Sequence, residues 1–310
     1  MLYSLALVQL GIPLALIVLH GLVPVGGLVG LVLRTAAIGL VIAYVAVAGV
    51  WLFPPWWTPW ALAGLLVAAS AIAARRWFAG RGAAWWWHAA DAVAAVAVGA
   101  VAVHLLLPAI NGRSAQADAV ELARPLEAGS YLVVSGGHEL AINAHLMTLA
   151  PEFGDYLGQS YGVDIIAVDG LGLRADGIAP EDPKAYFVYG REILAPCAGT
   201  VAGVVDGLPD MPAGQRDRAH MAGNHVILDC GGVHVVLAHM APASVTVSEG
   251  EAVAVAHPLG RVGNSGNTDE PHLHIHAQTP GSPGTPLNGQ PIPISVEGRT
   301  LLRNEVVTWR

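Results

Sequence analysis

The uneven distribution of charge along this chain limits its fold more than any other feature of the sequence. Nearly all residues from 1 to 110 are apolar, and the charged side chains there are Arg34, Arg75, Arg76, Arg81 and Asp91. Of the 310 residues in the whole chain, 54% are hydrophobic and only 12% are charged, which is too apolar for an ordinary soluble protein. The sequence therefore predicts a membrane-embedded first part and a globular, acidic second part.

Apolar segments in the first part are long enough to cross a hydrocarbon core, which takes roughly 20 apolar residues per helix. They lie near residues 3–20, 36–53, 58–74 and 89–107. The first segment lacks the basic start of a signal peptide, and further apolar segments follow it, so we interpret it as a span. We therefore expect a transmembrane helical region of about four spans over residues 1–110.

The arginines predict the orientation of this region, because short cytoplasmic loops retain Lys and Arg. Arg34 lies between the first and second expected spans, and Arg75, Arg76 and Arg81 lie between the third and fourth. Both loops are therefore expected on the cytoplasmic side, which places the second part of the chain outside. This arrangement predicts a multi-pass protein of the cytoplasmic (inner) membrane, in contact with its lipids, whose C-terminal domain is extracytoplasmic.

The second part of the chain has the pattern of an all-β domain. Residues 111–130 are polar and are expected to form a linker next to the membrane. From residue 131 to residue 310, short runs rich in Val, Ile and Leu alternate with clusters of Gly, Pro, Asn and Asp. The expected strands are Tyr131–Ser135, Gly162–Val168, Gly199–Asp206, Asn224–Asp229, Val233–His239 and Ser244–Val247. We predict an antiparallel, β-sandwich-like domain with one sizeable core.

Cysteine and charge also distinguish this domain. Both cysteines of the chain, Cys197 and Cys230, lie in it. Disulfides form in extracytoplasmic compartments, so the two residues are candidates for a disulfide, and a pair of buried thiols is the alternative. The net charge of −8 arises from this domain, because arginines outnumber the single aspartate in the first part. An acidic domain argues against nucleic acid as a partner, which requires a basic surface.

A run of alternating histidines, from His272 to His276, is the strongest functional signal in the sequence. Successive side chains of a strand point to opposite faces, so His272, His274 and His276 share one face, and Leu273 and Ile275 share the other. Three histidines grouped in this way are typical of a metal site or a proton-transfer site. The sequence therefore predicts such a site on this strand.

Two further residues are candidate partners for the histidine strand. Asp164 is a carboxylate within the apolar run Gly162–Val168, where an acidic side chain usually has a partner or binds a metal. His239 ends the run Val233–His239. We expect both side chains to lie near the histidines.

These pieces occur in the order of a known pattern. In lysostaphin-like, or LytM-like, zinc metalloendopeptidases, which cut peptide cross-links in bacterial cell walls, it reads His-x-Gly-x-Asp, Ala-Pro-x-x-Gly-x-Val, Ala-His, Gly-x-x-Gly-x-Ser/Thr-Gly and His-Leu-His. The matching segments here are Gly162–Asp164, Ala195–Val201, Ala238–His239, Gly260–Gly266 and His272–His274. The chain therefore resembles this family, whose fold is a duplicated hybrid motif of β-strands.

The resemblance implies a zinc ion and a role for four residues. Asp164 and His274 would be zinc ligands, while His239 and His272 would position or polarise the attacking water and stabilise the tetrahedral intermediate. Zinc suits this work because it lowers the pKa of bound water and polarises the scissile carbonyl. The implied substrate is peptidoglycan or another extracytoplasmic peptide, and the sequence names no protein partner.

One position departs from the family's pattern. The first ligand of the family is a histidine four residues before the aspartate, and here that position is Ser160, whose hydroxyl is a poor zinc ligand. A catalytic zinc has three protein ligands, so His145, His225 and His276 are candidate substitutes. The alternative is a catalytically degenerate domain that binds the cell wall or activates another hydrolase. Of these two hypotheses we favour the membrane-anchored peptidase.

Overall fold

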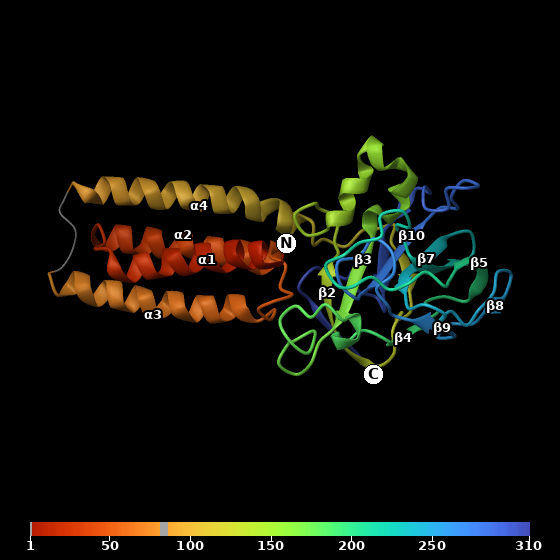
Figure 1. Ribbon diagram of the computed structural model, residues 1–310. Helices are drawn as coiled ribbons and strands as arrows, with labels where there is room; N and C mark the ends of the chain where they lie inside the picture. The colour runs from red at the N-terminus through yellow and green to blue at the C-terminus, as the bar shows by residue number, and fades with distance from the viewer. Residues whose placement is uncertain (1, 81–85) are drawn as a thin grey trace. The chain divides into compact units, whose positions relative to one another are not determined.

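The computed structural model describes residues 2–80 and 86–310, and for residues 2–6 it describes the backbone alone. The chain divides into two compact units, Met1–Asn111 and Gly112–Arg310. The first unit is helical and the second consists mainly of strands and loops (Figure 1). This division confirms the expected combination of N-terminal helices and a C-terminal β domain.

The first unit contains α1 (Leu2–Leu22), α2 (Gly27–Ala48), α3 (Thr58–Phe78) and α4 (Trp87–Asn111). Its apolar core includes Ile17 of α1, Ile38 of α2 and Leu62 of α3. Among the described residues, α2, α3 and α4 are long and apolar enough to cross a membrane, and the apolar stretch described in α1 is the shorter Leu7–Leu22. Three of the expected spans thus have suitable helices, and the first span stays a prediction.

One ion pair joins two of these helices. Arg34 of α2 and Asp91 of α4 form it, and Arg34 also donates to the carbonyls of Val23 and Pro24 at 3.1 and 3.0 Å. Arg81, which contributes to the predicted orientation, lies outside the described residues. Arg34, expected between two spans, therefore lies within α2, where it contacts α4 and the segment that follows α1.

The second unit is built around a sheet with the strand order β13-β2-β3-β10-β7-β6-β5-β8, with β11 added beside β10. Its pairs are antiparallel, and smaller two-stranded sheets pair β1 with β12 and β4 with β9. The strands are β1 (Val120–Leu122), β2 (Gly129–Ser135), β3 (Val163–Ala167), β4 (Glu192–Leu194), β5 (Gly199–Val205), β6 (Asn224–Asp229), β7 (His234–Met240), β8 (Ala252–Val253), β9 (Pro258–Arg261), β10 (Leu273–Gln278), β11 (Pro291–Ile292), β12 (Ile294–Val296) and β13 (Val306–Trp309). Short 3-10 helices are η1 (Ala144–Leu149), η2 (Pro151–Tyr161) and η3 (Pro183–Ala185).

The two faces of β10 are buried in different ways. Leu273 and Ile275 belong to the main core of the unit, together with Ile165 of β3 and Leu237 of β7. The opposite face of β10 carries the histidines, and η2 packs over this strand. The predicted alternation along β10 is therefore confirmed, and its polar face is enclosed rather than open to solvent.

A disulfide links Cys197 and Cys230, whose Cα atoms are 6.0 Å apart. Cys197 lies just before β5 and Cys230 just after β6, and these strands pair with Thr200 opposite Asp229. The bond therefore closes the open end of the β5–β6 hairpin. Of the two alternatives left by the sequence, the structure contains the disulfide.

Two expected segments differ from the structure. Residues 112–130, most of the expected linker, belong to the second unit, because β1 pairs in parallel with β12 and thereby joins the domain. Ser244–Val247, expected as a strand, forms none, although the backbone N–H of Thr246 donates to Leu259 at 3.0 Å. A positive φ of 54° at Ala243 turns the chain just before this segment and prevents continued pairing.

Candidate metal centre

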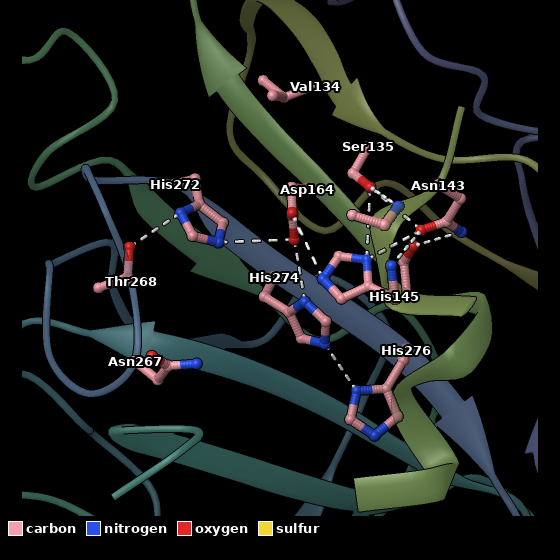
Figure 2. A network of polar contacts seen from close by, with 12 residues as sticks. Val134, Ser135, Asn143, His145, Asp164, Asn267, Thr268, His272, His274 and His276 are labelled. Carbon is pink, nitrogen blue, oxygen red and sulfur yellow. Dashed lines mark hydrogen bonds and ion pairs between the residues drawn. The ribbon is translucent and has the colours of Figure 1, made fainter. Parts of the chain in front are cut away.

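The candidate site lies on the enclosed face of the sheet, where β10 runs between β3 and β7. The register of β10 places His274 directly opposite Asp164 on β3 and opposite Ala238 on β7. Paired residues project to the same face of a sheet, so the side chains of Asp164 and His274 meet there. Nδ1 of His274 lies 2.9 Å from Oδ1 of Asp164 (Figure 2).

His145 reaches the same place from η1, outside the sheet. Its Nε2 lies 3.4 Å from Oδ2 of Asp164, and its ring centroid lies 4.7 Å from that of His274. One ligand atom from each of His145, Asp164 and His274 lies within 4.8 Å of the others. Within residues 2–80 and 86–310, this group of histidine and acidic side chains is the one arranged to hold a metal ion.

Asn143 fixes the ring orientation of His145 (Figure 2). The Nδ2 amide of Asn143 donates to the carbonyls of Gly137 and Gly162 at 2.8 and 3.1 Å, which leaves its Oδ1 as an acceptor. Nδ1 of His145 lies 3.0 Å from this Oδ1 and therefore carries the hydrogen. The lone pair of the neutral ring is then on Nε2, the nitrogen that faces Asp164.

His272 and His239 lie beside this group. Nε2 of His272 is 3.5 Å from Oδ1 of Asp164, and the ring centroids of His272 and His239 are 4.8 Å apart. The Nδ1 of each ring lies 2.8 Å from a backbone carbonyl, that of Glu270 for His272 and that of Ser265 for His239. Since a carbonyl oxygen only accepts hydrogen bonds, Nδ1 of each ring carries the hydrogen. The Nε2 atom of each ring is then the nitrogen that can act in the site.

The backbone at His239 departs from regular strand geometry. Strict alternation along β7 would direct His239 to the same face as Val235 and Leu237, which lie in the main core. His239 instead has a φ of 63°, next to a register shift between β6 and β7, and Met240 occupies the core. This local irregularity turns the imidazole towards His272, as bulges near functional sites often do.

Burial and neighbouring charge set the protonation of the candidate ligands. Burial lowers the pKa of His145 to about 4, although Asp164 opposes this shift. Burial alone would raise the pKa of Asp164, but the charges of His145 and His272, with hydrogen bonds from the histidines, hold it well below its usual range. At neutral pH the imidazole of His145 is therefore neutral and the carboxyl of Asp164 is ionised. These are the forms that bind metals.

The pKa values of the other two histidines shift in opposite directions. Burial lowers the pKa of His239 well below its usual value, and the charges of His272 and His274 add to this effect. Burial would also lower the pKa of His272, but attraction to the Asp164 carboxylate and a hydrogen bond that His272 donates to it outweigh burial and raise the pKa. The two rings therefore differ in how readily each holds a second proton.

Ser160 and His225 do not join this group. The Ser160 side chain is 0% exposed, donates to the carbonyl of Leu157 at 2.6 Å and lies 2.8 Å from the hydroxyl of Thr148. His225 is held by the carbonyl of Gly223, 2.8 Å from its Nδ1. Both side chains thus have partners of their own away from Asp164.

His276 lies behind His274 instead of beside Asp164. Its Nδ1 is 2.9 Å from Nε2 of His274, and its side chain is buried (Figure 2). Burial lowers the pKa of His276 well below its usual value, so the neutral ring can accept a hydrogen bond from Nε2–H of His274. That contact would leave Nδ1 of His274 as the nitrogen that faces Asp164.

Several residues around the site escaped the sequence analysis. Asn143 orients His145, and Thr268 and Glu270 contact Nδ1 of His272 at 3.2 and 2.8 Å. Each lies two or four residues before the histidine that it contacts. Local bonds of Asn and Thr side chains to neighbouring residues are common at such spacings, so this signal was available in the sequence.

Known proteins resemble the second unit only in part. Residues 185–290 match the profile of "Peptidase family M23", a range that includes His239, His272 and His274 but neither His145 nor Asp164. No curated protein matches the chain significantly.

Similar solved structures include a peptidase M23 from Pseudomonas aeruginosa, with 18% identity, a TM-score of 0.29 and coverage of 54% of this chain and 48% of that one. The catalytic domain of the antimicrobial peptidase lysostaphin from Staphylococcus simulans shares 19% identity over 40% of this chain and 71% of that one, with a TM-score of 0.26. A zinc-containing peptidase from Vibrio cholerae shares 15% identity over 47% of this chain and 48% of that one, with a TM-score of 0.23. The chain thus spans about half the length of the first and third of these proteins.

The family match agrees with the resemblance seen in the motifs, since it contains the Ala-Pro hairpin, Ala238–His239 and His272–His274. The chain therefore contains a domain of Peptidase family M23, matched over residues 185–290.

Proposed function

We propose that the second unit is a zinc metalloendopeptidase that hydrolyses peptide bonds in the cross-links of bacterial peptidoglycan. The observation that carries this proposal is the convergence of His145, Asp164 and His274 within 4.8 Å of one another. Two imidazole nitrogens and one carboxylate oxygen form a ligand set found in catalytic zinc sites of peptidases. His145 would then supply the third ligand in place of Ser160.

The surroundings of the three side chains fit a zinc ion. Asn143 holds the hydrogen of His145 on Nδ1, so Nε2 offers a lone pair. His276 is placed to do the same for His274 through Nε2, 2.9 Å away. Ligand nitrogens that are fixed by a second hydrogen bond are typical of zinc sites in proteins.

A bound zinc ion supplies Lewis-acid chemistry, since it lowers the pKa of water towards neutrality and polarises a carbonyl. His239 and His272 present Nε2 beside the candidate ligands, while backbone carbonyls fix both rings through Nδ1. Their nitrogens can accept a proton from water or donate one to a carbonyl oxygen that gains negative charge. We therefore assign these two histidines to proton transfer and to binding of the substrate carbonyl.

The proposal predicts that the zinc-loaded, full-length protein cuts purified cell-wall fragments and that Asp164→Ala abolishes cleavage, because the substitution removes a ligand. Mass spectrometry of released peptides would detect the new amino ends. The Asp217→Ala variant, whose partly exposed side chain lies outside the site, serves as the control and keeps activity.

Zinc-loaded protein that binds the fragments without cutting any bond would contradict the peptidase proposal. That result would favour the alternative, a catalytically degenerate domain that binds the wall or activates another hydrolase. Binding is measured on the same fragments by co-sedimentation, so one preparation distinguishes the two functions.

We also propose that the chain is anchored in the cytoplasmic membrane with the second unit outside. Support comes from three apolar helices of sufficient length and from the disulfide in the second unit, a bond of oxidising compartments. Lys184 is the only lysine and is exposed. A membrane-impermeant amine reagent added to intact spheroplasts should label wild-type protein more than Lys184→Arg. Equal labelling of the two, with strong labelling of wild type after lysis, would place the domain inside.

A further inference from the structure

A backbone carbonyl contacts Nδ1 of His272, the ring nitrogen opposite the one near Asp164. Nδ1 of His272 lies 2.8 Å from the carbonyl oxygen of Glu270, and the Thr268 hydroxyl is 3.2 Å away from the same nitrogen. The carbonyl belongs to the peptide that joins Glu270 to Pro271, and the proline ring fixes φ of the next residue. Few rotatable backbone bonds therefore lie between this carbonyl and His272. A shift of Glu270 would also shift the imidazole.

A buried arginine from a distant loop holds Glu270. Nε and Nη2 of Arg174 donate to Oε1 and Oε2 of Glu270 at 2.7 and 2.8 Å, so the contact is bidentate. The side chain of Arg174 is only 3% exposed. Its Nη1 also donates to the carbonyl of Ile178 at 3.2 Å, and its guanidinium lies 5.6 Å from the centre of the Tyr186 ring. Contacts on several sides fix the guanidinium in the loop that follows β3.

Stability alone does not account for this pair. Burying a guanidinium and a carboxylate is costly, and apolar residues of similar size often stabilise a protein as well or better. What the pair provides is a fixed, directional contact, because the planar guanidinium matches both oxygens of a carboxylate. Here that contact acts on the residue whose carbonyl orients His272.

We propose that Arg174 is a positioning residue for His272 and acts through Glu270. Arg174 fixes the Glu270 carboxylate, the Glu270 carbonyl retains the Nδ1–H of His272, and Nε2 of His272 is thereby kept towards Asp164, 3.5 Å away. The consequence of this positioning for catalysis rests on the proposed peptidase function. The effect of Arg174 on the His272 ring does not, because it follows from contacts within this chain.

The first test measures the ring itself. In full-length protein labelled with ¹⁵N-histidine, the Nδ1–H signal of His272 is identified by its loss in His272→Gln. Arg174→Lys keeps the positive charge but lacks the two-pronged contact, so we expect exchange of this hydrogen with water to become about tenfold faster. Exchange at the wild-type rate would overturn the proposal. If Arg174→Lys does not fold, Glu270→Gln is judged by the same two outcomes.

An ion pair at Asp269, the residue before Glu270, provides the matched control. Nε of Arg216 donates to Oδ1 of Asp269 at 2.6 Å, and the Arg216 side chain is 34% exposed. Arg216→Lys makes the same chemical change to the partner of Asp269, the residue before Glu270, and we expect the exchange of the His272 signal to match wild type. Acceleration of equal size in Arg216→Lys would overturn the specific role of Arg174.

A second test uses cleavage of cell-wall fragments. For Arg174→Lys we expect kcat to fall about tenfold while KM and zinc content stay at wild-type values, because His272 is a positioned group and not a ligand. Equal kcat in Arg174→Lys and Arg216→Lys would overturn the role in catalysis. If wild type cuts nothing but the exchange rates differ as expected, the proposed function fails and the positioning of His272 by Arg174 stands.

Discussion

His145 lies beside Asp164, with Nε2 3.4 Å from Oδ2, whereas the pattern that the sequence resembles has its histidine at the position of Ser160. Sequence reasoning identified His145, His225 and His276 as candidate ligands but could not choose among them, because all three lie in the same domain. The choice depends on how η1 and η2 fold. In that arrangement Ser160 turns to Leu157 and Thr148, and Asn143 directs His145 to the carboxylate.

Close packing around His274 leads to a prediction at Gly162. A Cβ at this position would lie 2.5 Å from Cε1 of His274 and 2.9 Å from the carbonyl oxygen of Gln159. His274 is held between Asp164 and His276, so it can move only by giving up one of these contacts. We expect Gly162→Ala to weaken zinc binding about 10-fold to 100-fold, measured by competition with a chelator.

Gly154 offers a matched control for that substitution. It also lies in this region, within η2, and a Cβ there would meet no atom within 4 Å. Gly154→Ala should therefore bind zinc as wild type does. Equal zinc affinity of Gly162→Ala and Gly154→Ala would show that His274 is not held in the way described here.

Strand alternation predicted part of the site at the level of elements. Period-two alternation placed His272, His274 and His276 on one face, and the apolar run around Asp164 was recognised as a strand, so two of the proposed ligands could be found. The strand register that pairs His274 with Asp164 was not predictable, because it depends on tertiary contacts.

His239 illustrates a second limit. Alternation along β7 would direct its side chain into the core, and the positive φ that turns it away comes from a bulge between β6 and β7. Such irregularities depend on pairing with other strands, so single-strand patterns do not reveal them. The expectation that His239 lies near the histidines agrees with its position beside His272, whereas alternation along the strand alone would predict its side chain in the core.

The β5–β6 hairpin carries a prediction about stability. A disulfide between residues separated by 33 positions stabilises chiefly by restricting the unfolded chain, and we expect about 2–4 kcal/mol of unfolding free energy from it. Replacing both Cys197 and Cys230 by alanine should therefore lower the urea midpoint of the second unit, measured by pulse proteolysis.

Zinc content provides the control, because the disulfide lies at the open end of the β5–β6 hairpin while the proposed ligands come from η1, β3 and β10. The variant should bind as much zinc as wild type. A urea midpoint that does not change, or that reductant does not lower in wild type, would show that the hairpin is held without the disulfide.

At the scale of the whole molecule, composition predicted more than motifs did. The scarcity of charged residues before residue 111 indicated the helical unit. The boundary observed between Asn111 and Gly112 lies at the end of the expected membrane region. The linker was not recognised as part of the domain, because the three residues of β1 are too few to give a period-two pattern. Short strands such as β8 and β11 escaped recognition for the same reason.

The proposed function depends on one claim, that His145, Asp164 and His274 together hold a metal ion. Elemental analysis of zinc in the purified full-length protein tests it most directly, with His145→Ala and His225→Ala analysed beside wild type. Our account predicts a single zinc ion per chain in wild type and in His225→Ala, and loss of zinc in His145→Ala. Wild-type protein without zinc, or zinc retained in His145→Ala, would contradict it.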